Sequence, residues 1–209
     1  MTLFSLRLFE MRLAAMALLT PSGLGNAMLY CSEGSATVDG NGLAADQVRH
    51  AAGGLEVRAG AGGARLLCFE LAAQRAPPPP GELKLAETIS LDPGAEYLMR
   101  CDRVDFPAGG IAYLHTHQGP GIRCLLHGHI SVETEGRVLQ IEPFEAWFEA
   151  GPAPVLARAS KTAETAFVRV MVLPRTLLGE SSIRYVLPED RDKPKRQRYT
   201  VFQDIPISL

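Results

Sequence analysis

The stretch Gly109-Gly-Ile-Ala-Tyr-Leu-His115-Thr-His117-Gln-Gly-Pro-Gly121 carries two histidines separated by one residue. Alternate side chains of a β-strand point to the same face, so both imidazoles should lie on the inner wall of whatever the strand encloses. Imidazole is the commonest protein ligand for Zn, Fe, Ni and Cu. The pair therefore indicates a metal site, a metal-free pocket whose histidines bind or protonate a ligand, or two structural histidines.

Composition narrows the possible partners. The chain has 209 residues and a net charge of −2, which gives no electrostatic reason to expect nucleic acid or an anionic membrane as a partner. The apolar run from Leu13 to Leu19 is preceded by Glu10 and is too short for a signal peptide core or a membrane span. We therefore expect a soluble protein with no membrane partner.

The four cysteines show no metal-binding spacing. None belongs to a C-x-x-C pair, and each lies in or beside an apolar run. Buried, reduced thiols are typical of cytosolic proteins. Together with the N-terminus, this pattern predicts a cytoplasmic protein with free cysteines, namely Cys31, Cys68, Cys101 and Cys124.

Short apolar or alternating runs recur along the chain between turn signals rich in Gly, Pro, Asn and Asp. Examples are residues 27–31, 65–71, 111–115 and 167–173, and no segment keeps a helical period over three turns. Such spacing is typical of an antiparallel β-barrel or sandwich. The sequence therefore predicts an all-β fold with little helix.

Four consecutive prolines, Pro77 to Pro80, form the clearest break, because proline cannot donate to a strand ladder and favours an extended spacer. We place a linker at 77–84. It separates an N-terminal unit at 1–76 from a C-terminal barrel at 85–176, and a tail follows at 177–209. We expect the tail to pack on the barrels or on a second subunit, and hence expect a homodimer.

The two sides of the linker resemble each other. Gly25-x8-Gly34-Ser-Ala-Thr-Val38 aligns with Gly119-x8-Gly128-His-Ile-Ser-Val132 at an offset of 94 residues. Self-similarity at this scale indicates two copies of one β unit. Chance similarity among short strands punctuated by glycine is the alternative. The copies differ in that only the second carries the histidine pair.

The residues around the pair resemble the first motif of the cupin superfamily, small jelly-roll barrels, which reads G-x5-H-x-H-x3–4-E-x6-G. Gly109, His115, His117 and the closing Gly128 match, whereas Gly121 stands at the glutamate position. The resemblance implies two tandem cupin-like jelly-roll barrels, of which the N-terminal one is degenerate. The chain looks like a bicupin of an uncharacterised bacterial group.

The second cupin motif, G-x5-P-x-G-x2-H-x3-N, is almost absent from this sequence. Only Gly151 matches, and Pro154 stands where the third histidine ligand is usual. Metal-binding cupins usually offer three histidines and one glutamate, so this chain keeps the positions of two ligands. The resemblance therefore implies at most one divalent metal (Zn, Fe, Ni or Mn) on His115 and His117, completed by other groups.

Four further residues are candidates for ligand binding. Arg123 and Tyr113 should face inward if pairing is regular, and an inward guanidinium needs an anionic partner such as a substrate carboxylate or a glutamate of the chain. Glu149 could supply a carboxylate, and Gln118 lies next to the pair. Tyr113 could equally be a core residue. No catalytic residue is predicted.

Three functions remain open. The first is a metal-dependent enzyme, of the dioxygenase or isomerase class, acting on an anionic metabolite. The second is a noncatalytic small-ligand sensor or binding module that works without metal. In the third, both barrels have only a structural role and bind no ligand. The sequence does not identify the small-molecule ligand.

Overall fold

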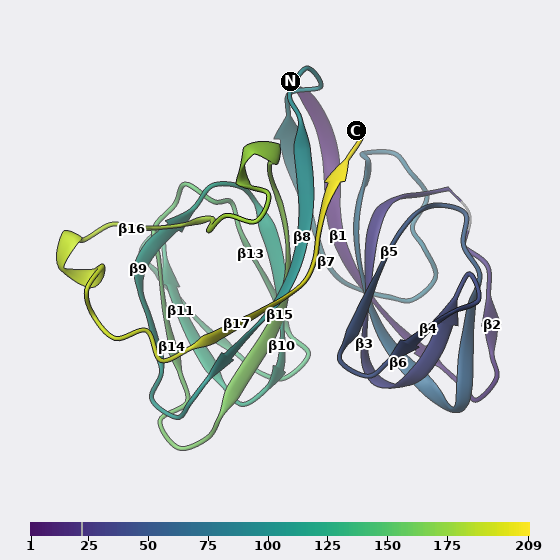
Figure 1. Ribbon diagram of the computed structural model, residues 1–209, viewed down its shortest axis with the longest axis horizontal. Helices are drawn as coiled ribbons and strands as arrows, with labels where there is room; N and C mark the ends of the chain where they lie inside the picture. Colours follow the sequence, from purple (N-terminus) through teal and green to yellow (C-terminus); the bar gives the residue numbers. More distant parts are fainter. Residues whose placement is uncertain (22) are drawn as a thin grey trace. The chain divides into compact units, whose positions relative to one another are not determined.

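Strands make up 64% of the chain in a computed structural model, which describes residues 1–21 and 23–209 (Figure 1). The only helices among these residues are two single turns, Arg175–Leu177 and Pro188–Asp190. The chain divides into two units, Met1–Ala95 with Leu209 and Glu96–Ser208. The all-β prediction is confirmed, with two jelly-roll units in tandem.

The first unit is a seven-stranded sheet that curls on itself. Its two long strands, β3 and β6, pair along most of their length, and their register shifts at two places, which bends them. At the second bend Gly34 has φ +74°, and a Cβ there would lie 2.2 Å from the carbonyl oxygen of Gly63. The strands are β1 (Thr2–Leu13), β2 (Leu18–Leu19), β3 (Leu24–Val38), β4 (Asn41–Ala44), β5 (Gln47–Gly53), β6 (Val57–Ala73) and β7 (Glu82–Leu91).

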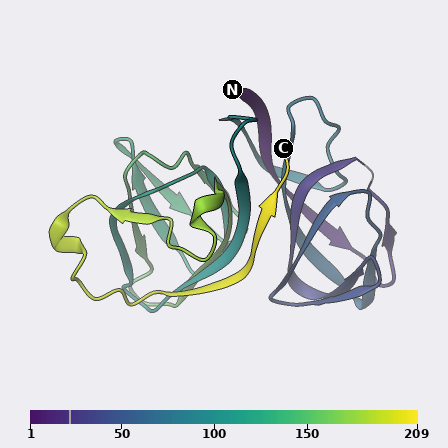
Figure 2. The same cartoon turned by 45° about the horizontal axis from the view of Figure 1, so that its top comes forward.

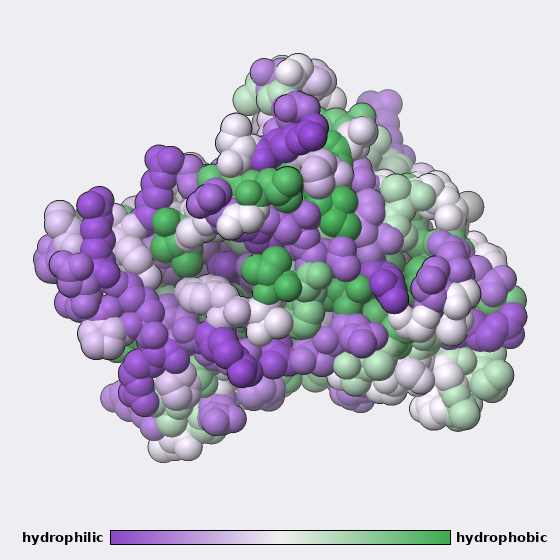
Figure 3. All heavy atoms as spheres, in the orientation of Figure 1, coloured by the Kyte–Doolittle hydropathy of each residue, from purple (hydrophilic) through white to green (hydrophobic). Residues whose placement is uncertain are grey.

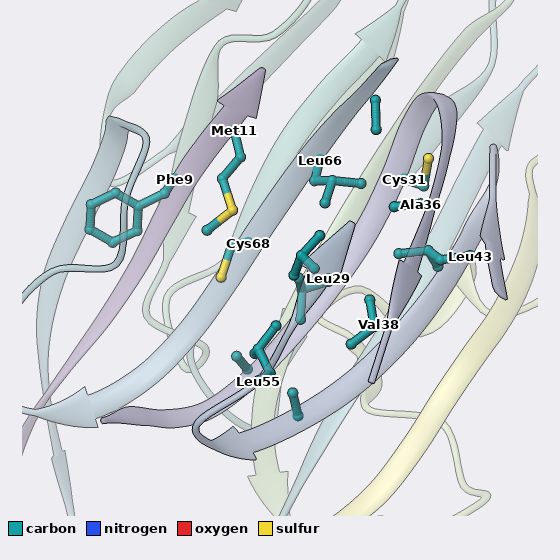
Figure 4. Packing of buried hydrophobic residues seen from close by; sticks show 14 of the residues in the cluster. Phe9, Met11, Leu29, Cys31, Ala36, Val38, Leu43, Leu55, Leu66 and Cys68 are labelled. Atoms are coloured by element: carbon teal, nitrogen blue, oxygen red, sulfur yellow. The ribbon is translucent and has the colours of Figure 1, made fainter. Parts of the chain in front are cut away.

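The interior of the first unit is mostly apolar. Phe9 and Met11 of β1, Leu29 of β3, and Leu66 and Cys68 of β6 belong to one buried cluster (Figure 4). Alternation along each strand places these side chains on one face, where they exclude water from the barrel. One buried ion pair lies on the same face two residues along these strands, where Nε of Arg7 is 2.7 Å from Oε2 of Glu70.

The second unit consists of two five-stranded sheets, in the orders β13-β10-β15-β8-β17 and β12-β11-β14-β9-β16. Val104, Phe106, Leu125, Trp147 and Phe167 form much of its apolar core. The strands are β8 (Tyr97–Phe106), β9 (Ile111–His117), β10 (Gly121–His127), β11 (Ile130–Thr134), β12 (Arg137–Ile141), β13 (Ala146–Glu149), β14 (Val155–Ala159), β15 (Thr165–Pro174), β16 (Ile183–Tyr185) and β17 (Arg198–Ile207).

The predicted division of the chain needs correction. Strand β7 follows the prolines, but it pairs with β1 from Thr2 to Glu10 and so belongs to the first unit. The boundary lies at Ala95/Glu96, and Pro77–Pro80 form part of the turn between β6 and β7. The ladder between β1 and β7 outweighs the local signal of the prolines, which marks a break in a ladder but not the end of a domain.

The C-terminal tail is part of the second barrel rather than a separate layer. Strand β17 pairs with β8 from Tyr97 to Asp105, and β16 pairs with β9 beside the histidine pair. Figure 2 shows this segment, coloured from green to yellow, running along the second barrel. Strands β16 and β17 of the tail are therefore the outer strands of the two sheets of that unit.

Apolar and hydrophilic groups are mixed on the surface. Figure 3 shows hydrophilic residues over most of the face in view, with small apolar patches between them. None of the helices among the described residues is long and apolar enough to cross a membrane. All four cysteines are buried and free, as predicted.

A candidate ligand site in the second barrel

The histidine pair lies inside the second barrel, as its spacing predicts. His115 and His117 are 5% and 3% exposed, and their Nε2 atoms lie 3.2 Å apart with the rings nearly perpendicular. Nδ1 of His115 donates to the carbonyl oxygen of Tyr113 at 2.6 Å, because a carbonyl can only accept. Nδ1 of His117 lies 3.4 Å from the hydroxyl of Ser182.

Tyr113 does not share the inner face, which corrects the prediction. The register of β9 against β14 shifts between Ala112 and His115, and both of these residues line the interior. This irregularity breaks the alternation and turns Tyr113 outward, where Lys193 lies 5.0 Å from its ring centroid. The side chain of Tyr113 therefore does not lie beside the histidine pair, although its backbone carbonyl accepts the hydrogen bond from His115.

Arg123 and Glu149 face each other beside the pair. Nη2 of Arg123 lies 2.6 Å from Oε2 of Glu149, and the same oxygen is 3.4 Å from Nε2 of His117. The two paired atoms do not meet hydrogen-bond geometry, so the contact is a buried ion pair. Oε1 of Glu149 accepts from the indole of Trp147 at 2.9 Å. Of the two partners considered for Arg123, the structure thus contains the internal one.

A second ion pair lies on the neighbouring strands. Arg169 of β15 donates to both carboxylate oxygens of Asp102 of β8, at 2.6 and 3.0 Å. All four groups are at most 8% exposed, so two cations and two anions are buried together. Such bidentate contacts hold both partners in fixed positions. The guanidinium of Arg169 also lies 5.7 Å from the ring centroid of Tyr199.

Burial and the nearby cations hold both imidazoles in the neutral form. Burial lowers the pKa of His115, and it lowers the pKa of His117 well below the usual 6.5. The charges of Arg123 and Arg169 act in the same direction. Burial also lowers the pKa of Arg123 to about 10, despite the opposing charge of Glu149, so the guanidinium stays charged at neutral pH.

Two cavities follow one another along the inner face of β8. Val104 and Phe106 line an inner cavity of about 20 Å³ beside the histidine pair. Arg100 and Asp102, further along the same face, line a larger cavity of about 540 Å³. Arg169 and Tyr199 border both. The inner cavity is large enough for about one water molecule, and the outer one for a small organic ligand.

The donor groups do not fit a resident metal ion well. Within residues 1–21 and 23–209, no three His, Cys, Asp or Glu side chains are grouped so that they could hold a metal ion. Glu149 is the carboxylate next to His117, and it is already paired with Arg123. The charges of the pairs Arg123–Glu149 and Arg169–Asp102 cancel without a further cation. A metal ion would add charge to a poorly solvated interior, which is costly.

The structure brings together most, but not all, of the predicted site residues. His115, His117, Arg123 and Glu149 line the inner cavity, whereas Gln118 lies just beyond the end of β9, half-exposed, and lines neither cavity of this unit. Sequence reasoning overlooked four other residues. Arg169 and Asp102 could have been found as charges inside apolar strands, which is the signal that singled out Arg123. Ser182 and Tyr199 come from the tail and give no such signal.

Comparisons with known proteins find similarity of structure only. No protein-family profile and no curated protein matches the chain. Oxalate decarboxylase from Lactobacillus farciminis, in a formate complex, has a TM-score of 0.66 and 13% identity, over 91% of this chain and 82% of that chain. Salicylate 1,2-dioxygenase from Pseudaminobacter salicylatoxidans has a TM-score of 0.54 and 11% identity, over 96% and 75%.

A further neighbour is oxalate decarboxylase from Bacillus subtilis, with a TM-score of 0.64 and 11% identity over 92% of this chain and 79% of that chain. At such low identity the likeness establishes the fold and leaves the chemistry open. These neighbours are cupin proteins. The chain therefore has the cupin fold, built as two tandem jelly-roll barrels of which only the second carries the histidine pair.

Proposed function

We propose that the second barrel binds a small organic molecule in its larger cavity, and that it does so without a metal ion. The observation that carries this proposal is the cavity of about 540 Å³, whose walls include Arg169 and Tyr199, two residues that also border the inner cavity. Ligand pockets commonly have volumes of about 300–1,000 Å³ and combine apolar walls with a few polar groups.

The lining favours an uncharged ligand with an apolar part. Ile183, Tyr199 and Val201 supply apolar surface, and the hydroxyls of Ser181 and Ser182 supply polar groups. The cations of the wall are already paired, Arg100 with Asp204 and Arg169 with Asp102. The expectation of an anionic metabolite depended on an unpaired Arg123, which the Arg123–Glu149 pair removes.

Phenol and benzoate are suitable probes, because they have the same ring and differ in charge. Ligand-observed NMR should detect phenol on the wild type more strongly than benzoate. Val201→Trp should abolish the signal by filling the cavity, since Val201 lines it and is 54% exposed. Val138→Trp is the matched control, because Val138 is 56% exposed on β12 and lines neither cavity of this unit.

Binding of either probe that Val201→Trp leaves unchanged would contradict the proposal, as would no binding to the wild type. Preferential binding of benzoate would favour an anionic ligand. The metal-dependent enzyme of the dioxygenase or isomerase class is the competing function. Elemental analysis of protein purified without a His tag tests it. Stoichiometric Zn, Fe, Ni or Mn in the wild type, lost in His115→Ala, would favour that enzyme.

A further inference from the structure

The cluster beside the histidine pair contains a cation of its own. We propose that the guanidinium of Arg123 serves as a fixed internal cation for Glu149 and the two imidazoles, and that it keeps divalent metals out of the second barrel. The proposal concerns the buried cluster and does not depend on which ligand occupies the larger cavity.

The first support is the position of the carboxylate. Oε2 of Glu149 is 2.6 Å from Nη2 of Arg123 and 3.4 Å from Nε2 of His117. Nε2 of His117 is in turn 3.2 Å from Nε2 of His115. Two imidazole nitrogens and one carboxylate oxygen are donors that Zn²⁺ accepts. Among the described residues these three groups do not form a metal site as they stand, and the guanidinium holds the one anionic donor.

The second support is the glycine at the position of the motif glutamate. A Cβ at Gly121 would lie 2.6 Å from the carbonyl oxygen of Val170, 2.7 Å from Cγ of Met171 and 3.1 Å from Nη1 of Arg123. Nη1 of Arg123 also donates to the carbonyl of Gly121 at 2.6 Å. The backbone of β15 therefore leaves little room for a carboxylate side chain at position 121, and the guanidinium of Arg123 occupies the space beside it.

The third support is the balance of charge. Arg123 and Arg169 are paired with Glu149 and Asp102, and the cavity next to the imidazoles measures only about 20 Å³. A divalent ion would add two positive charges to an interior in which both carboxylates are already neutralised. Uncompensated charge in such a place is strongly unfavourable, whereas removal of Arg123 would leave the carboxylate of Glu149, which lies beside His117, for a metal ion to neutralise.

The test is a gain of metal binding. Arg123→Met removes the charge and keeps an unbranched side chain of similar length. We expect this variant to bind Zn²⁺ stoichiometrically by calorimetric titration and elemental analysis, and Zn²⁺ to raise its thermal unfolding midpoint. The wild type should show neither effect. The gain should be lost in Arg123→Met/His117→Ala and in Arg123→Met/Glu149→Gln.

Arg169→Met is the matched control, because it removes the neighbouring guanidinium and leaves Asp102 without its partner; it should gain no zinc. Stoichiometric metal in the wild type would overturn the proposal. So would a folded Arg123→Met variant that gains no zinc, or an equal gain in Arg169→Met. If Arg123→Met is unfolded alone, Zn²⁺ should restore the circular dichroism of the wild type, and failure to do so would also overturn it.

Discussion

The two barrels differ in three residues that lie side by side across adjacent strands, which we call a row. In the first, Phe9 pairs with Cys68 and Cys68 with Leu29 across β1, β6 and β3, and all three side chains are buried in the apolar cluster. In the second, Asp102, Arg169 and Arg123 follow one another across β8, β15 and β10. When the two halves of the chain are aligned at the offset of 94 residues, Arg123 corresponds to Leu29.

One backbone scaffold thus supports either an apolar row or a row of ion pairs. Apolar side chains gain free energy when they leave water, whereas buried ion pairs regain little beyond their loss of hydration. The charged row therefore does not account for the stability of the second barrel. We interpret it as the part of that barrel that is kept for binding, and the following predictions test this contrast.

The largest effect is expected when a charge enters the apolar row. Leu29→Arg would bury a second guanidinium where the carboxylate of Glu70 is already paired with Arg7, and should destabilise the first unit by more than about 4 kcal/mol. Hydrogen exchange of peptides from β3 and β6 should show lost protection. Leu3→Arg, at a position that is 50% exposed on β1, should leave exchange unchanged. Equal protection in both variants would contradict the contrast.

A smaller loss is expected when one partner is removed from the charged row. Asp102→Ala should destabilise the second unit by about 3–5 kcal/mol, because Arg169 remains buried without its anion. Trp147 is the only tryptophan of the chain and lies in this unit, so its fluorescence during urea unfolding reports the change.

The double variant Asp102→Phe/Arg169→Cys copies the pair found in the first barrel. It should recover most of the stability that Asp102→Ala loses, because both charges are replaced by apolar groups. The double variant should at the same time weaken phenol binding, because the larger Phe side chain at position 102 would take up part of the cavity that Asp102 lines. A double variant as unstable as Asp102→Ala would show that the two rows are not interchangeable.

The smallest effect concerns pH. The pKa of His117 is below 6.5 in the folded chain, because of burial and the charges of Arg123, Arg169 and His115. Below pH 6.5 the unfolded chain therefore takes up a proton that the folded chain does not, so stability present above that pH is lost as the pH falls. We expect a loss of about 1 kcal/mol per pH unit relative to His117→Gln. Equal slopes between pH 7 and 5 would contradict this.

Assembly of two copies and a cytoplasmic location stay predictions. Light scattering of the intact chain measures the mass directly. Truncation at Leu187 cannot test whether the tail holds a dimer together. It would remove β17 from its sheet and expose β8. The intact protein is therefore the proper sample.

Local patterns predicted several features well. Period-two alternation and turn signals predicted the strands, and the spacing of His115 and His117 predicted two imidazoles on one inner wall. The inward position of Arg123 followed from the same alternation. Tyr113 was misplaced because the irregularity in β9 depends on pairing with β14, and sequence alternation alone does not reveal it.

The β-rich fold, the histidine pair and the glycine at the position of the usual glutamate can be read from local sequence, because each depends on residue types at short spacing. The partners of the charges emerge only when the chain folds. Arg123 meets Glu149, and Arg169 meets Asp102, through pairing of strands that are far apart in the chain. The tertiary structure also assigned β7 to the first barrel and the tail to the second, because strand ladders form between distant segments whose register no local pattern records.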